Sequence, residues 1–199
     1  MSTPAQVLII RHGEKLGDAS GDKDGGPDLS VRGSARAAAL TSLFAPRQAQ
    51  TSQLSCALAT AQGGFAGTYN AVSITGSAPP FPTPDFIFAT QASTHSNRPV
   101  ETITPLAAAL GLPYDDKHSD KDYAKVASDV LTNPKYVGMV VLICWHHGNI
   151  PNLATALGIA SPPAWPGTVF DLVWQITWKT GPATLASPGQ MLLYGDTAS

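Results

Sequence analysis

The chain is organised around one short stretch, Val7-Leu8-Ile9-Ile10-Arg11-His12-Gly13-Glu14-Lys15, in which an apolar run gives way to an arginine, a histidine and a glycine. Four consecutive aliphatic residues are typical of a strand that is buried on both faces. Ligand sites of open α/β sheets lie beyond the carboxyl ends of such strands. Arg11 offers a fixed fork of donors to a phosphate, and neutral His12 offers a ring nitrogen as nucleophile or base. Taken alone, the stretch equally fits a strand end capped by polar residues.

Composition predicts one globular domain over residues 1–199, because 43% of the residues are hydrophobic and only 13% are charged. A formal net charge of -2 provides no global field for nucleic acid or anionic lipid, so a few local cations must hold any anion. Two cysteines, Cys56 and Cys144, do not make a disulfide framework. With no signal-like N-terminus and no apolar run of membrane-spanning length, we expect a cytoplasmic protein with no membrane partner.

Downstream of the first strand, Ser30 is a plausible N-cap for a helix over residues 31–44. Its spacing offers Ala35, Ala38, Leu40 and Leu43 to the sheet and leaves Arg36 on a solvated face. An uncharged insert rich in Gly, Pro and Ser follows at about residues 46–84, with a short helix expected at 54–61 and a strand at 71–74.

Two further buried strands are predicted at residues 85–89 and 137–145, and a helix follows each. The first of these helices begins near Pro99 and ends at Gly111, and the second spans residues 150–157. Between the helix that ends at Gly111 and the 137–145 strand, we predict an acidic linker at 114–123 and then a helix to about Leu131. Residues 170–176 and 190–194 are predicted to pair as an antiparallel edge. This order predicts a three-layer α/β sandwich, with a mostly parallel central sheet flanked by helices on both faces.

The 137–145 strand ends in His146-His147-Gly148, the second histidine and glycine at the end of a buried strand. Arg98 follows the 85–89 strand. Because the carboxyl ends of parallel strands meet at one edge of a sheet, these side chains are expected to converge with Arg11 and His12. This convergence favours a functional interpretation over capping.

The residues that carry chemistry resemble the histidine phosphatase superfamily, in its phosphoglycerate-mutase-like branch. The matching blocks appear in the family's order: Arg11-His12-Gly13-Glu14, Leu29-Ser30-Val31-Arg32-Gly33, Ser96-Asn97-Arg98-Pro99-Val100-Glu101-Thr102 and His147-Gly148. The resemblance implies that His12 becomes phosphorylated, that Arg11 and Arg98 clamp the phosphoryl group, and that His147 is the second histidine.

The proton donor is where this chain departs from the family pattern, because the region that holds a glutamate in phosphoglycerate mutases contains only aspartates here. Glu14 and His146 are the leading candidates, since strand ends place both of them near the site. Asp120 and Asp122 stay open as alternatives. Gly13, Lys15 and Ser96 are expected to contact the substrate. We also expect His12 to be neutral on the attacking ring nitrogen, while a backbone carbonyl holds the other ring nitrogen.

These features predict a metal-independent phosphatase that hydrolyses phosphomonoesters or phosphorylated protein side chains through a phosphohistidine intermediate. Neither a cofactor nor a metal is expected, since the chain has no His-Glu-x-x-His spacing. The expected partner is a small phosphorylated substrate and not a nucleic acid, while the oligomeric state is open. The alternatives are a phosphoglycerate-mutase-type phosphotransferase and a catalytically silent module that binds phosphorylated ligands.

Overall fold

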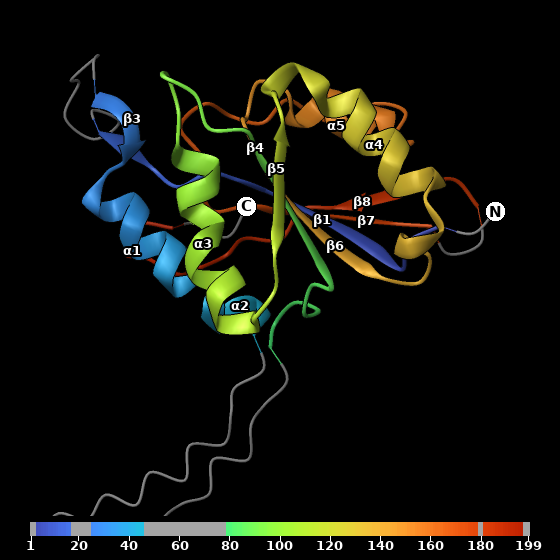
Figure 1. Cartoon of the computed structure of the whole chain (residues 1–199), viewed down its shortest axis with the longest axis horizontal. Coiled ribbons are helices and arrows are strands. Elements are labelled where there is room, and N and C mark those ends of the chain that lie inside the picture. The colour runs from blue at the N-terminus through green and yellow to red at the C-terminus, as the bar shows by residue number, and fades with distance from the viewer. Residues whose placement is uncertain (1–2, 17–24, 46–78, 179–180, 197–199) are drawn as a thin grey trace, which may run out of the picture.

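The computed structural model describes residues 3–16, 25–45, 79–178 and 181–196. Most of the predicted 46–84 insert, including the helix expected at 54–61 and the strand expected at 71–74, lies outside these residues. A six-stranded sheet crosses the middle of the molecule (Figure 1). Its order is β5 (Tyr114–His118), β4 (Phe86–Thr90), β6 (Val140–Trp145), β1 (Gln6–Arg11), β7 (Val173–Thr177) and β8 (Thr184–Ala186).

The sheet is mostly parallel, as predicted. β1 pairs in parallel with β6, β6 with β4, and β4 with β5, whereas β7 and β8 add an antiparallel edge. A separate short ladder joins β2 (Lys15–Leu16) to β3 (Gly25–Leu29). The predicted acidic linker at 114–123 is wrong in part, because it contains the edge strand β5. An edge strand needs only one neighbour, so its polar sequence lacks the apolar pattern of a central strand.

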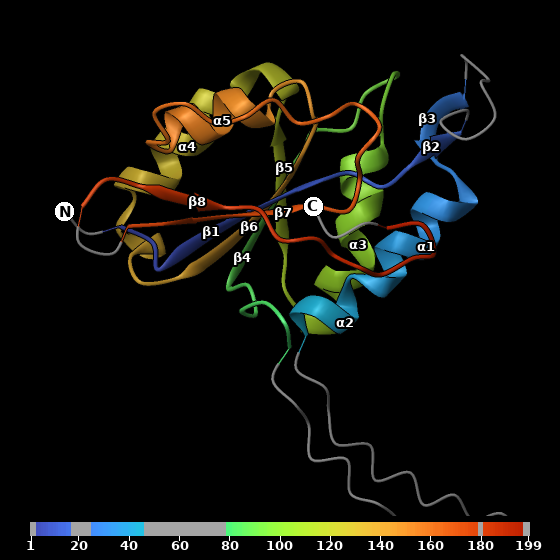
Figure 2. The ribbon, with the colours of Figure 1, turned by 180° about the vertical axis from the view of Figure 1, so that it is seen from behind.

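Helices cover both faces of the sheet, which confirms the three-layer α/β architecture (Figures 1 and 2). One layer comprises α1 (Val31–Ala39), α2 (Thr41–Phe44) and α3 (Arg98–Leu110), and the other comprises α4 (Tyr123–Thr132) and α5 (Ile150–Ala156). Short 3-10 turns, η1 (Asp120–Asp122) and η2 (Pro134–Tyr136), flank α4.

The aliphatic run of β1 is divided between two cores. Val7 and Ile9 pack with residues of α4 and α5, whereas Leu8 and Ile10 pack with residues of α2 and α3. All four are fully buried. Successive side chains of a strand point to opposite faces of the sheet, so a strand that is covered on both faces needs an apolar residue at every position.

The cap predicted for α1 is confirmed, because the Ser30 hydroxyl accepts a hydrogen bond from the Gly33 amide at 3.0 Å. The predicted buried face of this helix is partly wrong. Ala35 and Ala38 are exposed, whereas Arg36 is only 2% exposed. The carboxylates of Glu14 and Asp196, which are distant in sequence, form ion pairs with Arg36. The charged side chain can therefore be buried at a position where the local pattern predicts exposure to solvent.

The partner predicted for the antiparallel edge is also wrong. Residues 190–194 do not form a strand, and β7 pairs with β8 instead. The two segments still meet at a single antiparallel bridge between Leu172 and Gly189, and the buried side-chain amide of Gln190 donates to the carbonyls of Phe170 and Leu172.

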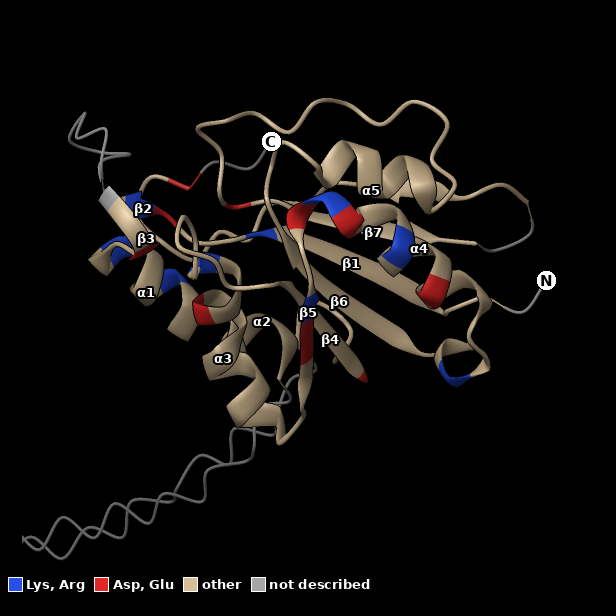
Figure 3. Ribbon diagram, turned by 45° about the horizontal axis from the view of Figure 1, so that its top comes forward, with Lys and Arg blue, Asp and Glu red and all other residues tan. Residues whose placement is uncertain are grey.

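Charged residues lie mainly on α1, η1, α4, β5 and the strand ends, while the middle of β1, β6 and β7 carries none (Figure 3). Within the described ranges, no helix is both long enough and apolar enough to span a bilayer.

Candidate active site

The register between β1 and β6 brings two histidines together. Arg11 pairs with Trp145, and the His12 amide donates to the Trp145 carbonyl at 3.3 Å. The residues that follow these partners are His12 and His146, whose ring centroids lie 5.1 Å apart at an interplanar angle of 66°. The predicted meeting of the two strand ends is therefore present in the structure.

His12 is held in one tautomer. Its Nδ1 lies 2.7 Å from the Gly13 carbonyl oxygen, and because a carbonyl only accepts, Nδ1 carries the proton. The ring is 3% exposed. Burial holds the pKa of His12 well below its ordinary value, and His146, Arg11 and Arg98 nearby lower it further, against the Gly13 hydrogen bond. His12 is thus neutral, as the sequence predicts, with an unprotonated Nε2.

The turn after His12 is fixed by close packing on two helices. The Gly13 amide donates to Oγ1 of Thr102 at 2.9 Å, and this hydroxyl donates to the Arg98 carbonyl at 2.7 Å. A Cβ atom added to Gly33 would lie 2.2 Å from the Glu14 carbonyl oxygen, which leaves room only for glycine. A Cβ atom added to Gly13 would likewise lie 2.8 Å from the Gly33 carbonyl oxygen, so the turn after His12 packs directly on the backbone of α1.

Arg11 is buried and its guanidinium is held from two sides. Nη1 donates to the carbonyls of Gly167 at 2.7 Å and Val169 at 2.9 Å. Cζ lies 3.5 Å from the centroid of the Phe170 ring, and that ring is 6.1 Å from the ring of His12. Phe170 was not predicted to lie near Arg11, since nothing in its own apolar stretch marks it as the partner of a distant arginine.

Arg98 is the first residue of α3, and its Nη1 donates to the Gly26 carbonyl at 3.0 Å. The predicted start of this helix is confirmed, because Pro99 lies in its first turn. Arg98 is also close enough to lower the pKa of both His12 and His146. The two arginines therefore approach the histidine pair from different strand ends.

His146 has an aspartate beside it. Nδ2 of Asn149 donates to Oδ2 of Asp120 at 2.7 Å, and the Asn149 amide donates to the His146 carbonyl at 3.0 Å. Burial lowers the pKa of His146, whereas the charge of Asp120 raises it. Asn149, which sequence analysis did not single out, therefore connects the two residues.

His147 lies next to the segment that holds Arg11. Its Nε2 is 3.7 Å from the position that a Cβ atom would occupy on Gly167. The segment 167–169 therefore passes beside both His147 and Arg11. The role of second histidine remains a prediction for His147, while the ring that faces His12 belongs to His146.

No protein-family model and no curated protein matches this chain. Among solved structures, the phosphoglycerate mutase from Bacillus anthracis superposes with a TM-score of 0.52 at 14% identity, covering 96% of this chain and 95% of the mutase. The chain has the phosphoglycerate mutase-like fold. At 14% identity, this match shows the fold alone.

Two other matches have lower TM-scores. A protein from Agrobacterium tumefaciens, named after the phosphohistidine phosphatase SixA, superposes with a TM-score of 0.46 at 16% identity. The match covers 92% of this chain and 97% of that protein. A protein from Escherichia coli, named as an alpha-ribazole-5'-P phosphatase, superposes with a TM-score of 0.49 at 14% identity. The match covers 91% of this chain and 94% of that protein. The assignment of the phosphoglycerate mutase-like fold depends on the first match.

Within this phosphoglycerate mutase-like fold, Glu14 does not fit the predicted role of proton donor. Its Oε1 lies 2.9 Å from Nε of Arg32 and 2.7 Å from Nη2 of Arg36. Burial alone raises the pKa of Glu14, but the hydrogen bonds and charge of Arg36, together with Arg32, outweigh burial and lower it. A carboxylate that is kept ionised at neutral pH has no proton to donate.

Asp122 is a poor donor for a similar reason. Hydrogen bonds from Lys125 and Ser119 lower its pKa to about 2. Lys15 begins β2 and pairs with Leu29. Ser96 is buried, and its hydroxyl has no hydrogen-bond partner in the described part of the chain. Contact of Gly13, Lys15 and Ser96 with substrate remains a prediction.

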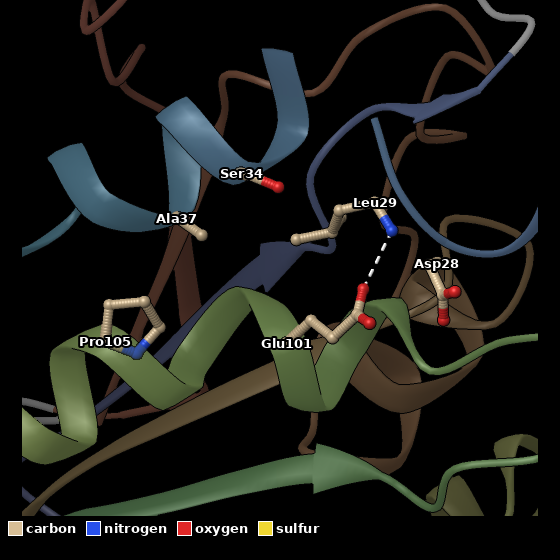
Figure 4. Close-up of a pocket in the computed structure, with 6 residues that line it drawn as sticks. All are labelled: Asp28, Leu29, Ser34, Ala37, Glu101 and Pro105. Atoms are coloured by element: carbon tan, nitrogen blue, oxygen red, sulfur yellow. Dashed lines mark hydrogen bonds between the residues drawn. The ribbon is translucent and has the colours of Figure 1, made fainter. Parts of the chain in front are cut away.

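A cavity of about 270 Å³ lies between β3, α1 and α3 (Figure 4). Its lining comprises Asp28, Leu29, Ser34, Ala37, Glu101 and Pro105. The Glu101 carboxylate accepts a hydrogen bond from the Leu29 amide at 2.7 Å, which joins α3 to β3. This cavity contains none of the histidines or arginines above. The described residues include no cluster of three or more His, Cys, Asp or Glu side chains suited to a metal.

Proposed function

We propose that this chain is a phosphatase that hydrolyses phosphomonoesters or phosphorylated protein side chains through a phosphohistidine on His12, without a metal ion. The hydrogen bond from Nδ1 of His12 to the Gly13 carbonyl carries the proposal, because it leaves Nε2 as a nucleophile beside two arginines. The phosphoglycerate mutase-like fold supports it.

In the first step, the lone pair of His12 Nε2 attacks phosphorus, the bond to the leaving oxygen breaks, and that oxygen takes a proton from an acid. In the second step, water attacks the phosphohistidine, the phosphorus–nitrogen bond breaks, and the water proton returns to the same group. Arg11 and Arg98 neutralise charge on the equatorial oxygens in both steps. The packing of Arg11 against two carbonyls and Phe170 supports such a role, because it orients the guanidinium before substrate arrives.

We assign the proton donor to His146, with Asp120 as the group that favours its protonated form. The ring of His146 lies against the ring of His12, whereas the Glu14 carboxylate forms an ion pair with Arg36. Burial lowers the pKa of His146 in the free protein. A bound phosphoryl dianion raises that pKa, so the proton is present when substrate occupies the site.

The donor assignment predicts a selective loss of rate. An alkyl phosphate leaves as a strongly basic alkoxide, whereas the leaving group of p-nitrophenyl phosphate needs little protonation. We expect His146→Gln to slow hydrolysis of an alkyl phosphate by about 10²-fold or more and that of the aryl phosphate far less. Asp120→Asn should show the same selectivity more weakly. Glu14→Gln serves as a comparison, and an equal loss on both substrates in His146→Gln would assign the donor elsewhere.

A panel of phosphorylated metabolites and phosphopeptides, assayed with a chelator present, tests the function itself. We expect release of inorganic phosphate from at least one substrate class at an undiminished rate. Transfer of the phosphoryl group to a second hydroxyl without net release would instead indicate a mutase. Saturable binding with no turnover of any substrate would indicate a binding module, and either result would overturn the proposal.

A further inference from the structure

Arg36 lies at the centre of a buried polar network. Its side chain is 2% exposed, and all three of its guanidinium nitrogens are engaged. Nη2 lies 2.7 Å from Oε1 of Glu14 and 2.8 Å from Oδ1 of Asp196. Nη1 donates to Oδ2 of Asp196 at 3.0 Å and to Oε1 of Gln190 at 3.2 Å, and Nε lies 3.1 Å from Oε2 of Glu14. One side chain thus joins α1, the turn after β1 and the 190–196 segment.

One arm of this network reaches the nucleophile. Glu14 is two residues beyond His12, and its carboxylate is oriented by Arg36. Its carbonyl accepts from the amide of Ser30 at 2.9 Å and from the hydroxyl of Ser30 at 3.0 Å. The Glu14 carbonyl is therefore tied to the N-cap of α1 and its carboxylate to Arg36 in the last turn of α1, which limits how far the His12 turn can move.

The second arm reaches the arginine clamp. The Gln190 amide accepts from Arg36 and donates through Nε2 to the carbonyls of Phe170 at 3.4 Å and Leu172 at 3.2 Å. The Phe170 ring in turn packs on the Arg11 guanidinium. Gln190 thus connects Arg36 to the backbone of the residue that orients Arg11.

We propose that Arg36 and Gln190 are positioning residues that set the His12 turn and the Arg11 clamp at a fixed separation. This inference depends on the proposed phosphatase function of the same site. Two cations, Arg32 and Arg36, balance two carboxylates, Glu14 and Asp196. A buried ion network often stabilises a core no more than apolar residues of equal volume do. Stability alone therefore does not account for hydrogen bonds that reach both the His12 turn and the residue that orients Arg11. A role in holding the geometry of the site does account for them.

The test variant is Gln190→Met, which keeps the side-chain volume and removes the bonds to Arg36 and to both carbonyls. Tyr136→Phe is the matched control, since it loses one hydrogen bond, from the hydroxyl to Asp129 at 3.1 Å, just before β6 begins and far from the strand ends of the site. Three quantities are measured in each protein: the melting temperature, kcat and KM for an aryl phosphate, and the pKa of His12 from an NMR titration.

We expect both variants to melt at lower temperature, but only Gln190→Met to lose kcat, on the order of tenfold, with KM nearly unchanged. The measured His12 pKa should rise towards its ordinary value in Gln190→Met but not in Tyr136→Phe, because a loosened site admits water. Asp196→Asn, which weakens the hold on Arg36 while keeping the side-chain shape, should change both quantities in the same directions and replaces Gln190→Met if that variant does not fold.

Wild-type kcat and an unchanged His12 pKa in a destabilised, folded Gln190→Met would overturn the positioning role. The titration also separates this inference from the proposed function. If the wild type hydrolyses no phosphate ester, the phosphatase proposal fails, whereas the His12 pKa still reports whether Gln190 positions that ring.

Discussion

Replacing His12 with alanine is expected to reduce turnover by at least about 10³-fold, because no other group supplies a nucleophilic nitrogen at the end of β1. The expectation follows from the neutral tautomer, in which Nδ1 bonds to Gly13 and Nε2 keeps its lone pair. Rapid quench of the wild type with labelled substrate should trap an acid-labile phosphate on His12, and the variant should trap none.

His95→Ala is the control for this experiment, since His95 is exposed in the loop after β4. The His12 ring is buried against His146 and Phe170, so alanine leaves a gap, and His12→Asn provides a second variant that fills more of it. A folded His12 variant that keeps about a tenth or more of the wild-type rate would rule out the covalent mechanism.

The second large effect is expected at the arginine clamp. Arg11→Lys and Arg98→Lys should each lose roughly 2–4 kcal/mol of transition-state stabilisation, measured as a fall in kcat/KM. Lysine has a single nitrogen and no planar face. It cannot bond to the Gly167 and Val169 carbonyls, pack flat on Phe170 and still present donors to a phosphoryl group.

Arg32→Lys is the matched control, because Arg32 has a side chain that is 43% exposed and a lysine can keep its ion pair with Glu14. Its kcat/KM should stay close to that of the wild type. Inorganic phosphate or vanadate should compete with substrate in the wild type and more weakly in the two clamp variants. An unchanged kcat/KM at position 11 or 98 would remove that arginine from the clamp.

Local sequence signals predicted the elements whose stability depends on their own residues. The aliphatic runs of β1, β4 and β6 indicated buried strands, Ser30 indicated the start of α1, and Gly111 ends α3 in the left-handed conformation that favours glycine. The polar edge strand β5 was missed, because pairing with β4 stabilises it more than any pattern of its own.

The placement of the candidate site residues was predictable where a residue type has few other uses at a strand end. His12, Arg11 and Arg98 belong to this group, because buried strands that end in cations and histidines bring those groups to one edge of a parallel sheet. The ion pairs of Glu14 disfavour its predicted role as proton donor, for a reason that the sequence pattern did not contain. Its protonation depends on Arg36, which lies 2.7 Å away but on another element, and the sequence pattern had placed Arg36 in solvent.

The sequence by itself therefore determined the layer order, the parallel sheet and the edge at which the reactive groups gather, since these follow from local periodicity and chain order. Only the tertiary structure decided which groups touch. The register of β1 with β6 brought His146, rather than the histidine of the His-Gly motif, against His12. The docking of segments 167–170 and 190–196 oriented Arg11 and buried Arg36. Contacts of this kind join residues that are far apart along the chain, and their free energy comes from burial and pairing that no local pattern records.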